Sequence, residues 1–110
     1  MQQHIEMWIN ALNEKANNPE VVHHLPDRQI KYILVPGTRY TKVVRDEFDI
    51  NSYLLLQRHV HAFIENATGD IYKAASWKSP ARNGARFNVV NDIENLLQVC
   101  DPYGSYLYKR

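Results

Sequence analysis

A basic and aromatic segment from Ile71 to Asn88 holds the residues of this sequence that are best suited to chemistry. It contains four cationic side chains, no acidic one, and three interleaved aromatic rings: Lys73, Lys78, Arg82 and Arg86, with Tyr72, Trp77 and Phe87. Cations neutralise phosphates and aromatic faces stack on bases, so this mixture is typical of sites for single strands or nucleotides. The turn at Gly84 also offers backbone N–H groups to an anion. The predicted ligand-binding residues are Lys73, Trp77, Lys78, Arg82, Arg86, Phe87 and Asn88.

The same segment also fits a purely structural role. Trp77 and Phe87 would then belong to the core, and the cations would keep a loop solvated, since aromatic residues beside lysine are common at sheet ends. One observation separates the two interpretations. A binding site needs the cations to converge on a concave face with Trp77 partly exposed, whereas a scaffold needs buried rings and diverging cations.

Five histidines raise the question of a metal site. His59 and His61 would share one strand face, and His23 and His24 would approach from a connector. No spacing matches a zinc signature, however, and half-exposed strand histidines explain the pattern as well. We therefore expect no metal site and no cofactor, with His59 and His61 as weak metal candidates only.

The residue pattern gives little support for catalysis. Ser76 and Ser79 lie in the basic segment but lack the strand-turn-helix context of a nucleophile elbow. Cys100 ends an apolar helical stretch, where a buried and inert thiol is expected. The carboxylates of residues 46–49 follow Arg45, which indicates a solvated, salt-bridged loop. No catalytic residue is predicted, and a protein that is not an enzyme is favoured.

Length and composition limit the functions further. A chain of 110 residues fits one domain, 1–110. The net charge of 13 − 12 = +1 excludes a protein that coats polyanions with its whole surface, yet the basic segment carries +4 against −3 elsewhere. A single cysteine excludes an internal disulfide framework. No apolar run approaches the roughly 18–20 residues that cross a bilayer, and no signal peptide is recognisable, so we expect a soluble intracellular protein without a membrane partner.

The elements that must position these residues begin with an N-terminal helix over residues 1–18. Ile5, Trp8, Ile9 and Leu12 form one apolar stripe with helical spacing. Residues 19–28 contain two prolines and read as a connector. That connector would allow the helix to move, or to swap between protomers.

From residue 29 onward the pattern predicts a sheet-based core, 29–110. Residues 30–35 and 39–45 are strand candidates around a tight turn in which Gly37 takes positive φ, and residues 46–51 are expected to form a loop. Residues 52–57 are ambiguous between helix and strand. Residues 59–64 and 71–77 form the clearest hairpin, with Gly69 in its turn.

The C-terminal third is expected to contain a loop, a short helix and a last strand. Residues 78–88 read as a structured loop with a turn at Asn83-Gly84. Asn91 caps a helix over residues 92–99, and residues 105–108 close the sheet as a final strand. The predicted class is α+β: a helix beside a four- to five-stranded antiparallel sheet.

Two blocks of the chain, residues 60–65 and 67–82, resemble a family of small proteins from tailed bacteriophages. Members share a Thr-Gly-Asp-Ile-Tyr-Lys-x-Ala-Ser-Trp-Lys-x-Pro-Ala block, followed by an Arg-x-Asn near Arg86 and a Gly-x-Tyr-Leu near Gly104. The resemblance covers roughly residues 38–110, and Phe87-Asn88 departs from the Gly-Asn of the family. It implies a phage origin and a place in the bacterial host cytoplasm, and it implies no activity.

Three functional hypotheses follow. The first is a binding protein without catalysis, whose basic segment holds single-stranded nucleic acid or a nucleotide. The second is a phage inhibitor or adaptor, for example an anti-defence factor, that binds a host protein through the same surface or the N-terminal helix. The third and weakest is a metal-dependent hydrolase using His59 and His61. A homo-oligomer is also expected to be accessible through the Trp8 helix or through Tyr103, Tyr106 and Tyr108.

Overall fold

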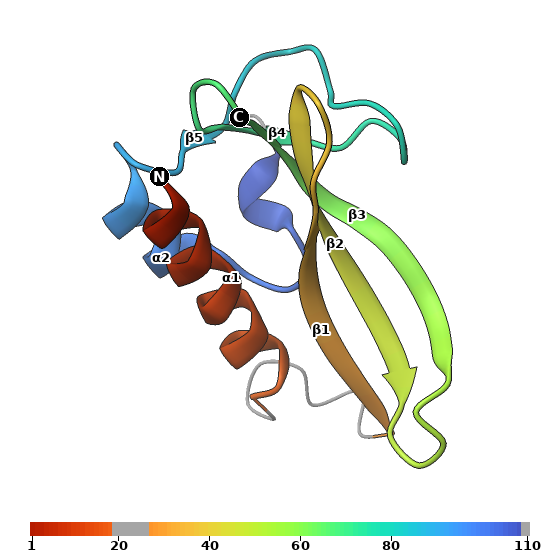
Figure 1. Cartoon of the computed structure of the whole chain (residues 1–110). Helices are drawn as coiled ribbons and strands as arrows, with labels where there is room; N and C mark the ends of the chain where they lie inside the picture. Colours follow the sequence, from red (N-terminus) through yellow and green to blue (C-terminus); the bar gives the residue numbers. More distant parts are fainter. Residues whose placement is uncertain (19–26, 109–110) are drawn as a thin grey trace.

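A computed structural model describes residues 1–18 and 27–108. One helix comes first, five strands follow it, and two short helices come last (Figure 1). In chain order they are α1 (Gln2–Ala16), β1 (Arg28–Val35), β2 (Tyr40–Asp49), β3 (Leu55–Glu65), β4 (Asp70–Lys73), β5 (Phe87–Asn88), α2 (Ile93–Val99) and the 3₁₀ helix η1 (Ser105–Leu107). The expected connector falls mostly on residues outside the described part of the chain.

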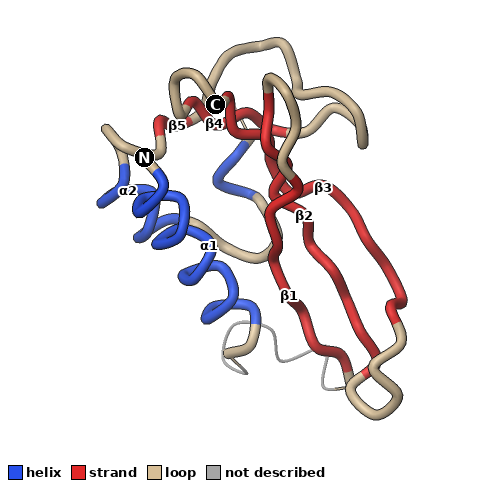
Figure 2. The backbone as a smooth tube through the Cα atoms, in the orientation of Figure 1, coloured by secondary structure: helices blue, strands red, loops and turns tan. Residues whose placement is uncertain are grey.

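The five strands form one antiparallel sheet in the order β1-β2-β3-β4-β5, so each strand pairs with its predecessor. Both α-helices lie on the same side of this sheet, with η1 between them and the strands (Figure 2). The predicted α+β class, with an N-terminal helix beside an antiparallel sheet, is confirmed.

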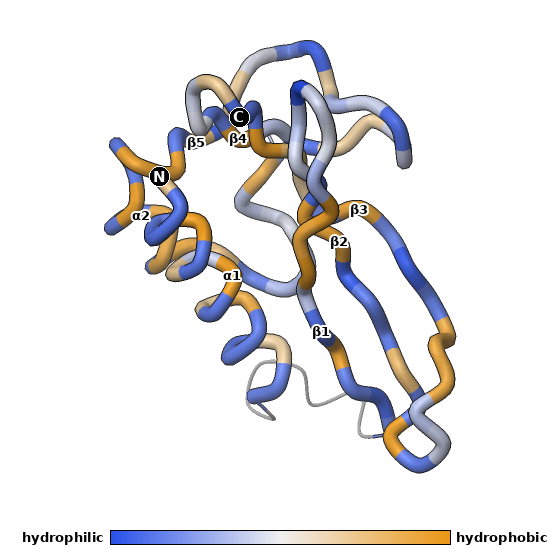
Figure 3. The backbone as a smooth tube through the Cα atoms, in the orientation of Figure 1, coloured by the Kyte–Doolittle hydropathy of each residue, from blue (hydrophilic) through white to orange (hydrophobic). Residues whose placement is uncertain are grey.

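Helix α1 covers the sheet with the apolar stripe that its sequence predicts. Ile5, Trp8 and Leu12 are buried in the same core as Ile30 and Tyr32 of β1. Trp8 is fully buried, so the face that would have served an interface is occupied by the chain's own sheet. The hydropathy pattern along α1 follows this division between a buried and a solvated face (Figure 3).

Two asparagines of the helix region also cover the outer edge of β1. Asn13 accepts a hydrogen bond from the Tyr32 N–H at 2.7 Å and donates one to the Tyr32 carbonyl at 3.3 Å. Asn17 donates to the Ile30 carbonyl at 3.3 Å. The backbone groups that an edge strand would leave to solvent are therefore satisfied at these residues.

Lys15 ties α1 to the end of α2. Its ammonium group donates to the carbonyl oxygens of Leu97 at 3.0 Å, Gln98 at 3.3 Å and Cys100 at 2.6 Å. These carbonyls close the C-terminal turn of α2, where a cation is favoured by the helix dipole. The Cys100 thiol is buried beside this ammonium, and its burial raises its pKa.

The structure corrects the expectation of a loop at residues 46–51, because β2 continues to Asp49. Asp46 accepts two hydrogen bonds from the guanidinium of Arg58 on β3, at 2.7 and 2.9 Å. Glu47 lies 3.7 Å from the guanidinium groups of both Arg28 and Arg45. Acidic residues that look like a solvated loop are thus paired across the sheet. The ambiguous stretch 52–57 is also resolved, since β3 starts at Leu55.

The expected final strand at residues 105–108 is wrong, because residues 105–107 form the 3₁₀ helix η1. The carboxylate of Asp101 accepts the N–H groups of Tyr103 and Gly104, both at 2.8 Å, and the Ser105 hydroxyl at 2.6 Å. Gly104 follows with φ of 79°, and these contacts wind the chain instead of extending it. The fifth strand of the sheet is Phe87–Asn88.

Two smaller expectations also differ. Strand β4 ends at Lys73 rather than at residue 77, because Ala75 and Ser76 both donate to the Ser79 carbonyl and curl the chain away. Gly37 is absent from the glycines with positive φ. It is required instead by close approach, since a Cβ there would lie 2.6 Å from the Tyr40 carbonyl oxygen.

His61 of β3 is a buried titratable side chain beside the core. Its Nε2 lies 2.6 Å from the Tyr106 hydroxyl, and the Tyr32 ring packs edge-on at 5.1 Å between centroids. Burial lowers the pKa of His61 to about 3; the charges of Arg45 and His59 act in the same direction, and Asp101 opposes them.

We predict that stability falls as the pH drops through 6.5, because His61 then binds a proton in the unfolded chain but stays neutral in the folded one. The free energy of unfolding should decrease by about 2 kcal/mol between pH 7 and pH 5 from this group alone. Urea denaturation at each pH measures the change. In His61→Gln the free energy of unfolding should depend less on pH. The dependence that remains should have the same sign, because burial also lowers the pKa of His59. An unchanged dependence on pH in the variant would contradict the assignment.

Candidate functional site

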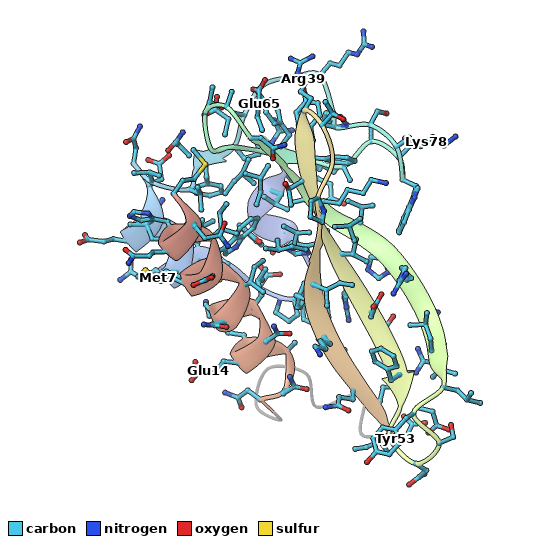
Figure 4. All side chains as sticks on the ribbon, viewed as in Figure 1. Met7, Glu14, Arg39, Tyr53, Glu65 and Lys78 are labelled. Atoms are coloured by element: carbon cyan, nitrogen blue, oxygen red, sulfur yellow. The ribbon has the colours of Figure 1, made fainter. Side chains whose placement is uncertain are left out.

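The four cations of the basic segment do not converge on one face. Lys78 and Arg82 are exposed on the loop after β4, and Lys78 points outward from it (Figure 4). Within residues 1–18 and 27–108, neither side chain has a hydrogen-bond or ion-pair partner. Lys73, by contrast, lies at the end of β4, with its ammonium 4.0 Å from the centre of the Tyr108 ring. Lys73 and the pair Lys78 and Arg82 therefore do not form one binding surface.

Arg86 uses its guanidinium group to hold the chain together. Its Nε donates to the Leu107 carbonyl at 2.6 Å, Nη1 to the Gly84 carbonyl at 2.5 Å and Nη2 to Oδ1 of Asn83 at 3.0 Å. These bonds join the loop after β4 to the C-terminal segment. With the Asn83 carbonyl, which Nη1 also reaches at 3.5 Å, a ligand would have to compete with four internal acceptors for this cation.

Phe87 and Asn88 also make internal contacts. The Phe87 ring is partly buried and lies 5.9 Å from the Tyr106 ring. The amide of Asn88 donates to Thr68 and Asp70 at 2.9 and 3.0 Å, and its Oδ1 accepts the N–H of Asn91 at 3.0 Å. Asn88, rather than the predicted Asn91, thus organises the turn before α2, whose N-cap Asp92 makes no side-chain capping bond.

A cavity of about 180 Å³, here called the pocket, opens beside β3 and brings Lys73 together with residues from other strands. Its polar lining comes from Arg45, His59, His61, Lys73, Tyr103 and Tyr108. Its apolar lining includes Pro102, Gly104 and Leu107, all of them buried. Two basic side chains and two histidines therefore share one concavity.

Arg45 is the buried charge of this pocket, with 8% of its surface exposed. Its Nη1 donates to the Pro102 carbonyl at 2.8 Å, and the Tyr32 hydroxyl donates to the same carbonyl at 2.8 Å. Its Nη2 lies 3.7 Å from Glu47, a carboxylate that Arg28 shares at the same distance. In the described part of the chain, Nε of Arg45 is buried without a hydrogen-bond partner. The positive charge of Arg45 is therefore only partly compensated.

The neighbouring histidines are subject to this positive charge. Partial burial lowers the pKa of His59 and Arg45 lowers it further, while Glu47 and Asp46 act in the opposite direction. Asp101 is the other nearby carboxylate, and N–H and O–H donors of its own turn already bind it. The pocket is thus a site of positive potential.

A second cavity of about 360 Å³, here called the side groove, adjoins the pocket. It is lined by Arg58, His59, Val60 and residues 74–77, so that His59, Val60 and Ala74 border both spaces. Trp77 is 42% exposed, and Lys42 lies over its ring at 4.5 Å from the centre. The partial exposure that a binding role requires of Trp77 is present, although the convergence of Lys78, Arg82 and Arg86 is not.

Sequence reasoning missed Arg45 as a binding residue and considered His59 only for metal. Arg45 faces His59 across the β2–β3 ladder, a pairing that no local motif reveals. One signal was available, since the alternation of Val43, Arg45 and Glu47 continues the inward face of β2 with charged residues.

For a metal ion, the described residues offer no group of three or more His, Cys, Asp or Glu side chains. His59 and His61 line the same pocket, but Nε2 of His61 is engaged by Tyr106. His23 and His24 lie outside the described residues. Among the helices that the structure describes, none is long and apolar enough to cross a membrane.

Comparison with known proteins gives a match over nearly the whole chain. Residues 1–109 match the sequence model of a family of unknown function (DUF7717), and the match includes the N-terminal helix that the phage resemblance leaves out. No curated protein and no solved structure matches.

We predict that Arg86 and Arg82 differ in their effect on stability, although both belong to the basic segment. Arg86→Ala removes four internal hydrogen bonds and should lower the free energy of unfolding by about 1–3 kcal/mol. Arg82→Ala, the matched control, should change it by less than about 0.5 kcal/mol, because its side chain is exposed and unpartnered. Urea denaturation of both variants tests this, and equal effects would contradict it.

Proposed function

The chain belongs to the DUF7717 family of unknown function, and we propose that it is a non-enzymatic protein that binds a phosphate-bearing ligand, single-stranded nucleic acid or a nucleotide. The observation that carries this proposal is the meeting of Arg45, His59 and Lys73 around one pocket. The basic segment supplies Lys73 and Trp77, whereas β2 supplies Arg45 and β3 supplies His59.

The charge balance supports an anionic ligand. Arg28 and Arg45 share the carboxylate of Glu47, and the ammonium of Lys73 faces an aromatic ring rather than a carboxylate. A buried guanidinium with an unpaired N–H is costly unless further negative charge lies near it. A phosphate in the pocket would supply that charge and would accept hydrogen bonds from cationic donors.

The outer cations have a supporting role in this proposal. Lys78 and Arg82 line neither cavity, so they would raise the local concentration of an anionic ligand without contacting it directly. The resemblance to phage proteins belongs to the same proposal. On that basis we propose that the chain acts in the cytoplasm of a bacterial host, where nucleotides and nucleic acids are abundant.

A second candidate function, the binding of a protein partner such as a host factor, is favoured by a different observation. The turn between β2 and β3 exposes an uncharged apolar cluster, here called the tip: Ile50, Tyr53, Leu54, Leu55 and Leu56. The chain is hydrophobic on both sides of this turn (Figure 3). Tyr53 lies at the end of the sheet that is far from Lys78 (Figure 4). Exposed apolar patches of this kind mark protein–protein contacts. Helix α1, by comparison, has its apolar face buried.

We predict that inorganic phosphate binds in the pocket and that binding weakens with rising salt concentration. Titration followed by NMR should shift signals of Lys73 and His59. Lys73→Ala should weaken binding about fivefold or more, because a charge-assisted contact is lost. Lys78→Ala, which removes the same charge from the outer loop, should change affinity less than about twofold at moderate salt. Equal loss in both variants, or no shift at Lys73 and His59, would rule out the pocket.

The second candidate predicts that a protein partner is retained after nuclease treatment and depends on the tip. Leu54→Ser combined with Leu56→Ser should abolish retention in an affinity pull-down, because it removes exposed apolar area. Lys73→Ala should leave retention unchanged. A partner retained equally by the tip variant would show that this surface is not the one used.

A further inference from the structure

The pocket and the side groove are neighbouring cavities with chemically different linings, and we treat them as the two ends of one candidate site. His59, Val60 and Ala74 border both spaces, so a ligand that extends around β3 would contact both. Their volumes of about 180 and 360 Å³ together lie within the usual range for small-molecule sites, roughly 300–1,000 Å³.

The pocket is the cationic and more enclosed end. Lys73 and Arg45 supply its positive charge, and the buried residues Pro102, Gly104 and Leu107 form part of its wall. An internal phosphate of a nucleic acid strand continues into a sugar on both sides, and therefore needs a site that is open at both ends. A terminal phosphate needs only one opening, which the side groove provides.

The side groove is the less charged and aromatic end. The guanidinium of Arg58 makes two hydrogen bonds to Asp46, so its charge is already neutralised. Trp77 contributes a partly exposed ring with Lys42 over it, and the neighbouring residues 74–76 are small. An uncharged, flat group such as a base fits this end, since stacking on an aromatic ring tolerates every base.

We propose that the ligand is a nucleoside carrying a terminal phosphate, with the phosphate in the pocket and the base on Trp77. This inference rests on the proposed function, because it assumes that phosphate binds in the pocket. The chemistry is shared by two sources: a free nucleoside monophosphate and the phosphorylated end of a strand. The difference in charge between the two ends orients the ligand, and the more enclosed pocket favours a terminal phosphate over an internal one.

The test compares five probes by isothermal titration at low salt: inorganic phosphate, adenosine, adenosine 5′-monophosphate, and one oligonucleotide in two forms, with a 5′-hydroxyl and with a 5′-phosphate. The monophosphate should bind about tenfold or more tightly than phosphate, and adenosine should bind weakly. The monophosphate should also quench the fluorescence of Trp77, which is partly exposed, whereas Trp8 is buried. The 5′-phosphate oligonucleotide should bind more tightly than its 5′-hydroxyl counterpart; if only the free monophosphate binds, the strand end is excluded as a source and the free nucleotide is assigned.

Variants separate the two ends of the site. Trp77→Ala should reduce the affinity for the monophosphate to near that for phosphate and leave phosphate binding unchanged, whereas Trp77→Phe should restore part of the gain. Tyr53→Ala, an exposed aromatic residue at the tip, is the matched control and should change neither.

The outcomes distinguish this inference from the function beneath it. If phosphate binds and the monophosphate binds no more tightly, the base site on Trp77 is overturned while the phosphate pocket stands. Equal binding of the 5′-hydroxyl and 5′-phosphate oligonucleotides, at the level of the monophosphate, would overturn the terminal-phosphate requirement. If neither phosphate nor the monophosphate binds, the proposed function itself is overturned.

Discussion

The carbonyl oxygen of Pro102 is the acceptor on which the arrangement around the pocket depends. It receives the Tyr32 hydroxyl from β1 and the Arg45 guanidinium from β2, each at 2.8 Å. Both donors are buried, and a buried donor without an acceptor costs more than the bond itself contributes. The sheet therefore fixes the path of the C-terminal segment, and that segment in turn forms the wall of the pocket. Asp101, immediately before Pro102, bends the chain so that the carbonyl meets both donors.

Periodicity predicted the parts of the fold that are stabilised by apolar burial. The stripe of α1 and the alternation in β1 and β3 each require only that one face be buried, and a local pattern shows this. Residues 46–49 were misjudged because Asp46 and Glu47 pair with Arg58 and Arg28, which lie on the neighbouring strands and 12 or more positions away in the chain. Residues 105–107 were misjudged for a related reason, since the side chain of Asp101, and not an apolar pattern, decides their conformation.

The candidate site was predictable only in part. Charge and aromatic content drew attention to Lys73 and Trp77, and both border the cavities. The same criterion selected Arg86 and Asn88, whose polar groups serve internal bonds, because composition cannot tell a free donor from a used one. Arg45 and His59 meet through strand register, which no motif reveals, and the alternation along β2 indicated only that Arg45 faces inward. Arg45 and His59, which turn a charged loop into a pocket, thus belong to strands for which the sequence suggested only a structural role.

The asparagines that cover β1 have a consequence for how copies of this chain can associate. A sheet that grows without limit by adding strands needs two available edges, one for each neighbour. Here Asn13 and Asn17 bind backbone groups of Ile30 and Tyr32 along one edge, so a strand from another copy would have to displace these side chains in order to pair there. The helix region therefore hinders growth of the sheet at this edge as well as covering the core.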